Sequence, residues 1–131
     1  MSNPNADELI SNLFANRPLL HKDGTQDYGI DLRTVPLLRA AITPGCRTVE
    51  TGSGISTLVF LILGAKHTSV TLDADEPKRI GTYCQAHGIP IGNYSPITGR
   101  SENVLPGLTL DVPIDVALVD GSHSFPVPCI D

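Results

Sequence analysis

The sequence predicts an α/β fold, a Rossmann-like doubly wound parallel sheet with helices at its N-terminal end. Three observations lead to this prediction. Strand-like and helix-like segments alternate from residue 46 onward, the first strand runs into a glycine turn, and polar residues follow the ends of the predicted strands. Strands that alternate with helices form right-handed βαβ units in a parallel sheet. We therefore expect the strand order 3-2-1-4, which is the first half of a doubly wound fold.

The glycine turn joins the first strand, predicted at 46–50, to an apolar helix predicted at 55–63. Gly52 and Gly54 lack a Cβ atom, so the backbone can turn tightly and a ligand can approach it closely. Gly64 follows the apolar run and is a typical helix stop. The N-terminus of such a helix presents N–H groups and a partial positive charge, which favour a carboxylate or phosphate. A glycine pair alone is a weak signal, because ordinary strand–turn–helix connections also need small residues.

Two helices are predicted before the first strand, at 6–14 and 34–42. In the second, Thr34 is the expected cap and Pro36 fits the first turn. Its predicted buried face consists of Leu37, Leu38 and Ala41. We accordingly divide the chain into an N-terminal helical segment, 1–45, and a cofactor-binding part, 46–131.

The remaining elements follow the same alternation. They are a strand at 69–72, a helix at 77–87, a strand at 94–98, a helical turn at 101–105 and a strand at 114–119. The last strand is nearly all apolar, which predicts burial on both faces. Polar residues stand at or just after the strand ends, where ligands of open α/β sheets bind: Glu50, Asp73, Gly99, Arg100, Ser101 and Asp120.

Composition limits the classes of function. The chain has 131 residues and a net charge of −5, with no basic run, so we expect neither nucleic acid nor a membrane surface as a partner. The N-terminus lacks the features of a signal peptide, and no apolar run is long enough to span a bilayer. Three cysteines without paired spacing (Cys46, Cys84, Cys129) predict reduced thiols in a cytoplasmic protein and no zinc site.

Asp73 closes the second strand, where a carboxylate can accept hydrogen bonds from a ribose diol. The alternative is that Asp73 caps the next helix, but Asp75 suits that role better, so ribose contact is favoured. Two cofactor classes use this geometry. A nicotinamide dinucleotide needs a third glycine where this chain has Thr57, whereas S-adenosylmethionine needs an acid near its amine and hydroxyls near its carboxylate. Glu50 and Ser56 provide both.

Four segments together resemble the class I S-adenosylmethionine-dependent methyltransferases, in the branch related to small-molecule, catechol-type O-methyltransferases. They are VETGSGIST at 49–57, VTLDAD at 70–75, GRSENVLP at 99–106 and IDVALVDGSH at 114–123. The resemblance implies that the methionine part is held by Glu50, Gly52, Ser53, Gly54 and Ser56. It also implies that Asp73, with Ala74, holds the ribose and that Ser101 borders the adenine.

By the same resemblance, Asp120 faces the methyl group and His123 is a candidate general base near the substrate. A backbone-bonded loop residue is an equally good interpretation of His123. The sequence departs from the family at Arg100, where relatives carry an acid near the adenine. Relatives also continue with further strands after the fourth. A divalent metal would therefore need residues beyond Asp131, because Asp120 alone cannot hold magnesium.

Three functional hypotheses remain open. The first is the cofactor-binding portion of a methyltransferase that is truncated after strand four and acts on a small-molecule oxygen or nitrogen. The second is an inactive cofactor-binding or interaction module, and the third is an NAD-type Rossmann protein. An apolar strand at the sheet edge also predicts self-association through that edge.

Overall fold

The computed structural model describes residues 6–18, 20, 32–107 and 113–119. In these ranges the helices are α1 (Ala6–Ala15), α2 (Val35–Ala41), α3 (Ile55–Ile62), α4 (Glu76–His87) and α5 (Ser101–Val104). Short 3₁₀ turns, η1 (Leu32–Thr34) and η2 (Leu105–Gly107), flank α2 and α5. The strands are β1 (Arg47–Thr51), β2 (Lys66–Thr71), β3 (Tyr94–Thr98) and β4 (Val116–Val119).

The four strands form one parallel sheet in the order β3-β2-β1-β4. This confirms the predicted fold class and strand order. The chain enters the sheet at β1, moves to one side through β2 and β3, and then crosses to the other side of β1 to form β4. The reversal of direction between β1 and β4 is the switch point at which such sheets bind ligands.

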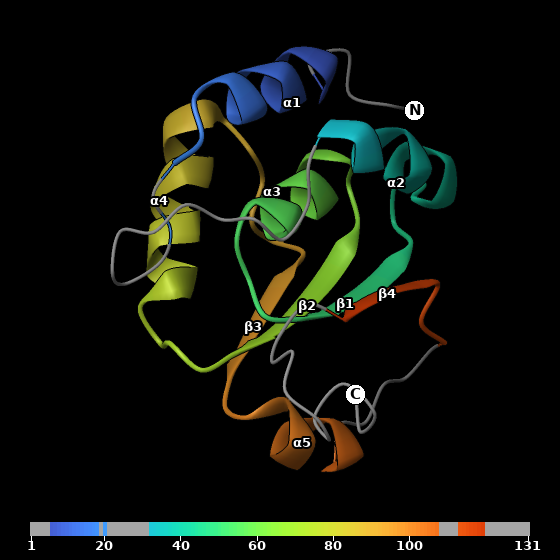
Figure 1. The fold of residues 1–131 in the computed structure, drawn as a ribbon, viewed down its shortest axis with the longest axis vertical. Helices are drawn as coiled ribbons and strands as arrows, with labels where there is room; N and C mark the ends of the chain where they lie inside the picture. The colour runs from blue at the N-terminus through green and yellow to red at the C-terminus, as the bar shows by residue number, and fades with distance from the viewer. Residues whose placement is uncertain (1–5, 19, 21–31, 108–112, 120–131) are drawn as a thin grey trace.

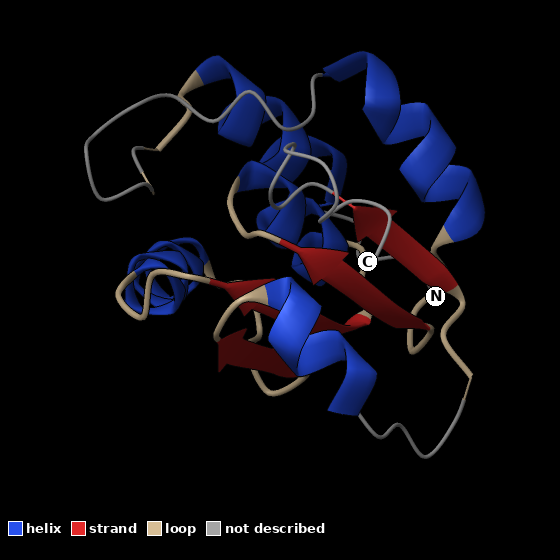
Figure 2. Ribbon diagram, turned by 60° about the horizontal axis from the view of Figure 1, so that its bottom comes forward, coloured by secondary structure: helices blue, strands red, loops and turns tan. Residues whose placement is uncertain are grey.

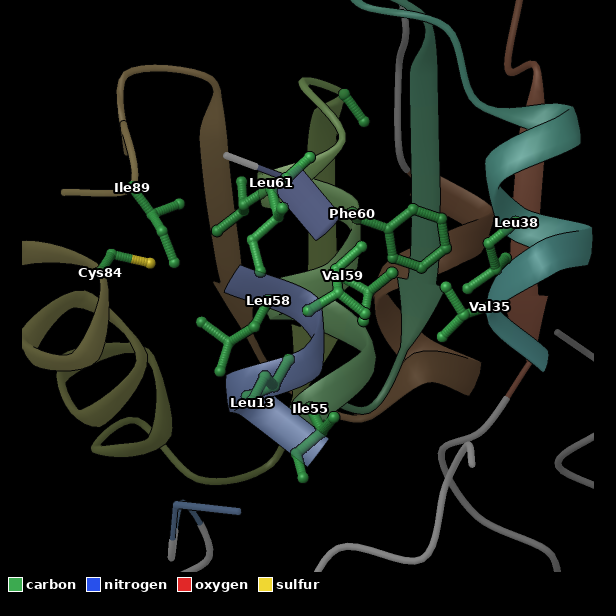
Figure 3. Packing of buried hydrophobic residues seen from close by; sticks show 14 of the residues in the cluster. Leu13, Val35, Leu38, Ile55, Leu58, Val59, Phe60, Leu61, Cys84 and Ile89 are labelled. Carbon is green, nitrogen blue, oxygen red and sulfur yellow. The ribbon is translucent and has the colours of Figure 1, made fainter. Parts of the chain in front are cut away.

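Helices α1 to α4 gather on one side of the sheet, and α5 stands apart from them (Figures 1 and 2). α3 lies at the centre of the hydrophobic core, because every one of its residues is buried. Figure 3 shows its side chains surrounded by residues of α1, α2 and α4, among them Leu13, Val35, Leu38 and Cys84. The N-terminal helices therefore cover α3, which carries the glycine turn at its start.

The predicted buried face of α2 is wrong at two of its three residues. Leu37 is 72% exposed and Ala41 is also exposed, whereas Leu38 is buried together with Val35 and Ile42. The helix begins one residue later than predicted, after the 3₁₀ turn. Thr34 holds the cap position, but its side chain makes no capping hydrogen bond.

Strand β2 begins at Lys66 rather than at residue 69. The added residues are polar and show no apolar alternation, which is why the sequence did not indicate a strand there. His67 is nevertheless only 1% exposed. It is buried because its ring nitrogens find polar partners on β1.

Strand β4 is not buried on both faces as predicted. Val116 and Leu118 pack against the core, while Ala117 is exposed and Val119 is 48% exposed. β4 is the last strand in the sheet order and pairs with β1. Self-association through β4 stays a prediction. Among the described residues, no helix is long and apolar enough to cross a membrane.

Candidate functional site

The glycine turn connects the end of β1 to the start of α3. Gly52 has a φ angle of 86° and Gly54 one of 157°, in the region that favours glycine over other residues. The Gly52 N–H donates to the Val70 carbonyl at 2.6 Å, so the turn is joined to β2. The Gly54 N–H donates to Oγ1 of Thr57 at 3.0 Å, which closes the first turn of α3. One backbone bond and one bond to a side chain thus fix the turn.

Glu50 lies beneath this turn and not at its surface. The residue is 1% exposed. Its Oε2 accepts a hydrogen bond from the Ser56 hydroxyl at 2.6 Å, and its Oε1 accepts one from the Thr57 hydroxyl. A buried carboxylate costs much free energy unless several donors solvate it, and these two hydroxyls from the first turn of α3 do so.

His67 is the third side chain bonded to the Glu50 carboxylate. Its Nε2 lies 2.9 Å from Oε1 of Glu50, and its Nδ1 lies 2.6 Å from Oγ1 of Thr48. Its ring also stacks on Phe60, with the centroids 4.4 Å apart and the planes inclined by 12°. Sequence reasoning missed this residue. The available signal was its register, since a strand that starts at Lys66 sets His67 directly beside Thr48.

The expected contact between Glu50 and the amine of a cofactor stays a prediction. In the structure both carboxylate oxygens are bonded to protein side chains, and the side chain is fully buried. The visible role of Glu50 is to hold the first turn of α3 against β1 and β2.

Asp73 follows the end of β2 and is already bonded within the protein. Its Oδ1 accepts the Asp75 N–H at 2.8 Å, and its Oδ2 lies 2.6 Å from Nη2 of Arg79. Asp75 holds the cap position of α4 without a side-chain capping bond. Asp75 thus occupies the N-cap position as expected, but its side chain does not cap the helix, and Asp73 accepts the N–H of this N-cap residue in a turn before α4. Ribose contact by Asp73 stays a prediction.

Glu76 is a site residue that the sequence did not suggest. It is 9% exposed, and its Oε2 accepts hydrogen bonds from the hydroxyls of Ser53 and Thr71, the latter at 2.9 Å. This carboxylate links the glycine turn to the end of β2 and the start of α4. Its only sequence signal was the acid typical of a first helical turn.

The other predicted residues lie farther along the chain. Ala74 is exposed between β2 and α4, and Ser101 begins α5. Gly99, which precedes α5, has a φ of 156°, and a Cβ there would lie 2.7 Å from Cγ2 of Val104. Asp120 and His123 lie outside the described residues. The structure thus brings together Glu50, Gly52, Ser53, Gly54 and Ser56 around the turn.

Cys84 is not a candidate for a nucleophile. Cys46 and Cys84 are free thiols, as predicted, and Cys129 lies outside the described residues. Burial raises the pKa of the Cys84 thiol to about 11, so it stays protonated near neutral pH. Burial also raises the pKa of Tyr94 to about 12, and its neutral hydroxyl pairs with Ser69 at 3.2 Å. Within the described ranges, no group of three or more His, Cys, Asp or Glu side chains is placed to hold a metal.

We expect Asp73→Ala to lower the free energy of unfolding by about 1–2 kcal/mol. The change removes the acceptor of the Asp75 N–H and the partner of Arg79, and hydrogen bonds to a charged group contribute about this much. Asp73→Asn keeps an oxygen for the Asp75 N–H and loses the charge beside Arg79, so we expect a loss of about 1 kcal/mol or less. Urea unfolding of both variants measures the two contributions, and equal losses would show that the ion pair, not the hydrogen bond from the Asp75 N–H, carries the effect.

No model of a known protein family matches the sequence, and no curated protein matches it. Solved structures do match its fold. A SAM-dependent methyltransferase from Thiobacillus denitrificans, in complex with S-adenosylhomocysteine, aligns with a TM-score of 0.55 and 20% identity over 93% of this chain and 45% of its own. One from Geobacter sulfurreducens, with the same compound, gives a TM-score of 0.53 and 18% identity over 90% of this chain and 43% of its own.

A third match is the C-terminal domain of precorrin-6Y C5,15-methyltransferase from Rhodobacter capsulatus. Its TM-score is 0.54 at 19% identity, over 77% of this chain and 55% of its own. The chain therefore has the fold of class I S-adenosylmethionine-dependent methyltransferases and spans about half the length of these neighbours. The catechol-type branch is not distinguished by these matches.

Proposed function

We propose that this chain forms the cofactor-binding portion of an S-adenosylmethionine-dependent methyltransferase. The observation that carries the proposal is the Gly52–Gly54 turn at the carboxyl end of β1, beside the switch point of a sheet ordered β3-β2-β1-β4. Two neighbours with this fold are complexes with S-adenosylhomocysteine. Their fold and the local backbone geometry of the turn in this chain together support cofactor binding at this place.

The residues around the turn suit such a ligand. Gly52 and Gly54, at positive φ angles that favour glycine, have no side chains, so the backbone of the turn is open to a ligand. A hydroxyl and two carboxylates lie near the ends of β1 and β2, on Ser53, Asp73 and Glu76. These groups suit the ribose hydroxyls and the amine of S-adenosylmethionine. Bound there, the sulfonium cofactor would supply an activated methyl group.

The chain's own contribution to methyl transfer would be to position the cofactor. Direct displacement needs the acceptor aligned with the methyl–sulfur bond, and fixing two reactants in this geometry provides much of the rate enhancement. We propose a small-molecule oxygen or nitrogen as the acceptor. Asp120 and His123 remain our candidates for the residues nearest the methyl group and the acceptor.

Calorimetric titration with S-adenosylhomocysteine and with NAD tests the proposal. We expect the former to bind and the latter not to, because Thr57 occupies the position of the third dinucleotide-binding glycine. Binding of NAD alone, or of neither compound to the folded chain, would contradict it.

We expect Gly52→Val to weaken binding of S-adenosylhomocysteine by at least about tenfold. A branched side chain is disfavoured at a φ of 86° and would stand where the cofactor passes the turn. Gly92→Val is the matched control, because that glycine is exposed and a Cβ there would meet nothing within 4 Å. Unchanged affinity in a folded Gly52→Val protein would remove the turn from the binding site.

A further inference from the structure

We propose that His67 is a positioning residue for the glycine turn. It would set the shape of the turn through Glu50, without contacting the cofactor itself. The consequence for cofactor affinity rests on the proposed function. The consequence for the turn rests on the contacts of His67, Glu50 and Thr57 alone.

The contacts form one continuous path from β2 to the turn. His67 Nε2 donates to Glu50 Oε1, the Thr57 hydroxyl donates to the same oxygen, and Thr57 Oγ1 accepts the N–H of Gly54. The side chains of His67 and Glu50 are fully buried, and Thr57 is also fully buried. Close packing leaves little freedom for any member to move while the others stay in place.

The donors and acceptors in this path connect His67 to the glycine turn. Carboxylate oxygens accept hydrogen bonds, so we assign the proton of the His67–Glu50 contact to Nε2 of His67. Thr57 uses its hydrogen on Glu50 and its lone pair on Gly54. If the His67 donor is removed, Glu50 loses one of its solvating groups and must draw more from Ser56 and Thr57, which shifts the start of α3.

The far side of the ring keeps His67 in this orientation. Thr48 Oγ1 lies 2.6 Å from Nδ1 and makes a hydrogen bond with that side of the ring. Phe60, about one helical turn beyond Ser56, stacks on the ring face. The hydrogen bond and the stacking together hold the ring plane, so His67→Phe keeps the shape of the ring and loses both nitrogens.

The test uses His67→Phe, which keeps a ring against Phe60, and His67→Gln, which keeps an N–H donor for Glu50. The matched control is His87→Phe, because His87 is exposed on α4, where it stacks on Tyr83. The first readout is amide hydrogen exchange at Gly54, corrected for global stability. We expect exchange at least about tenfold faster in His67→Phe and close to wild type in His67→Gln and His87→Phe.

The second readout is the affinity for S-adenosylhomocysteine. We expect it at least about tenfold weaker in His67→Phe and largely restored in His67→Gln. Unchanged Gly54 exchange in His67→Phe, or equal loss in His67→Gln, would overturn the positioning role. If His67→Phe does not fold, the Gln variant decides: protected Gly54 with retained affinity supports the proposal, and an exposed Gly54 overturns it.

The two proposals fail in different ways. If the wild-type chain does not bind S-adenosylhomocysteine, the proposed function fails, while Gly54 exchange still reports on His67. If wild type binds and His67→Phe binds equally well with an unchanged turn, only the positioning role fails.

Discussion

Glu50→Ala is expected to lower the free energy of unfolding by about 3–5 kcal/mol. The substitution leaves the donors of Ser56, Thr57 and His67 without their acceptor in a fully buried region. Removing one partner of a buried hydrogen-bonded pair typically costs this much, because the remaining polar groups stay desolvated and unpaired. Urea unfolding followed by circular dichroism measures the change.

Two variants make this measurement specific. Glu50→Gln keeps the shape and one acceptor oxygen, so we expect a smaller loss of about 1–3 kcal/mol. Glu8→Ala removes an exposed glutamate of α1, and surface changes of this kind usually stay within about 0.5 kcal/mol. If Glu50→Ala costs no more than Glu8→Ala, the buried network does not stabilise the fold.

Phe60→Ala is expected to cost a similar amount, about 3–5 kcal/mol. Phe60 is 0% exposed at the centre of the core (Figure 3), and truncating such a side chain loses both its burial and the packing around the cavity. It also removes the ring that stacks on His67. Thermal and urea unfolding give the change in stability.

The controls separate the size of the side chain from its position. Phe60→Leu keeps most of the apolar volume and loses the aromatic stack, so we expect a loss of roughly 1–1.5 kcal/mol. Leu37→Ala removes a side chain that is 72% exposed on α2, and we expect little change. Equal effects of Phe60→Ala and Leu37→Ala would contradict the placement of α3 in the core.

The sequence predicted the strand order because alternation of strands and helices, with right-handed connections, allows few topologies. It predicted the glycine turn because backbone with positive φ favours glycine, so the residue type itself indicates the turn. Burial was harder to predict. The face of α2 depends on how the helix meets α3, and Leu37 and Leu38 are equally apolar, so periodicity alone could not choose between them.

The buried polar network was also beyond the sequence. The sequence around His67 does not indicate a buried residue, because the burial of His67 depends on its partners Glu50 and Thr48 on the neighbouring strand. Asp75 holds the N-cap position that its residue type favours, but only the geometry of the turn shows that its side chain makes no capping bond and that Asp73 accepts its N–H. These hydrogen bonds depend on contacts between residues distant in sequence or on the local path of the backbone. Residue type alone predicts neither.

The pairing of Asp73 with Arg79 has a consequence for the ionic-strength dependence of binding. Arg79 also donates to the Leu20 carbonyl, which keeps its guanidinium in place beside the carboxylate. A ligand that approaches Asp73 therefore meets a nearly neutral pair and not an isolated anion. Long-range attraction of cationic ligands by Asp73 is weak for this reason, so added salt changes this attraction little. Recognition at this strand end then depends on the direction of hydrogen bonds, which salt leaves almost unchanged.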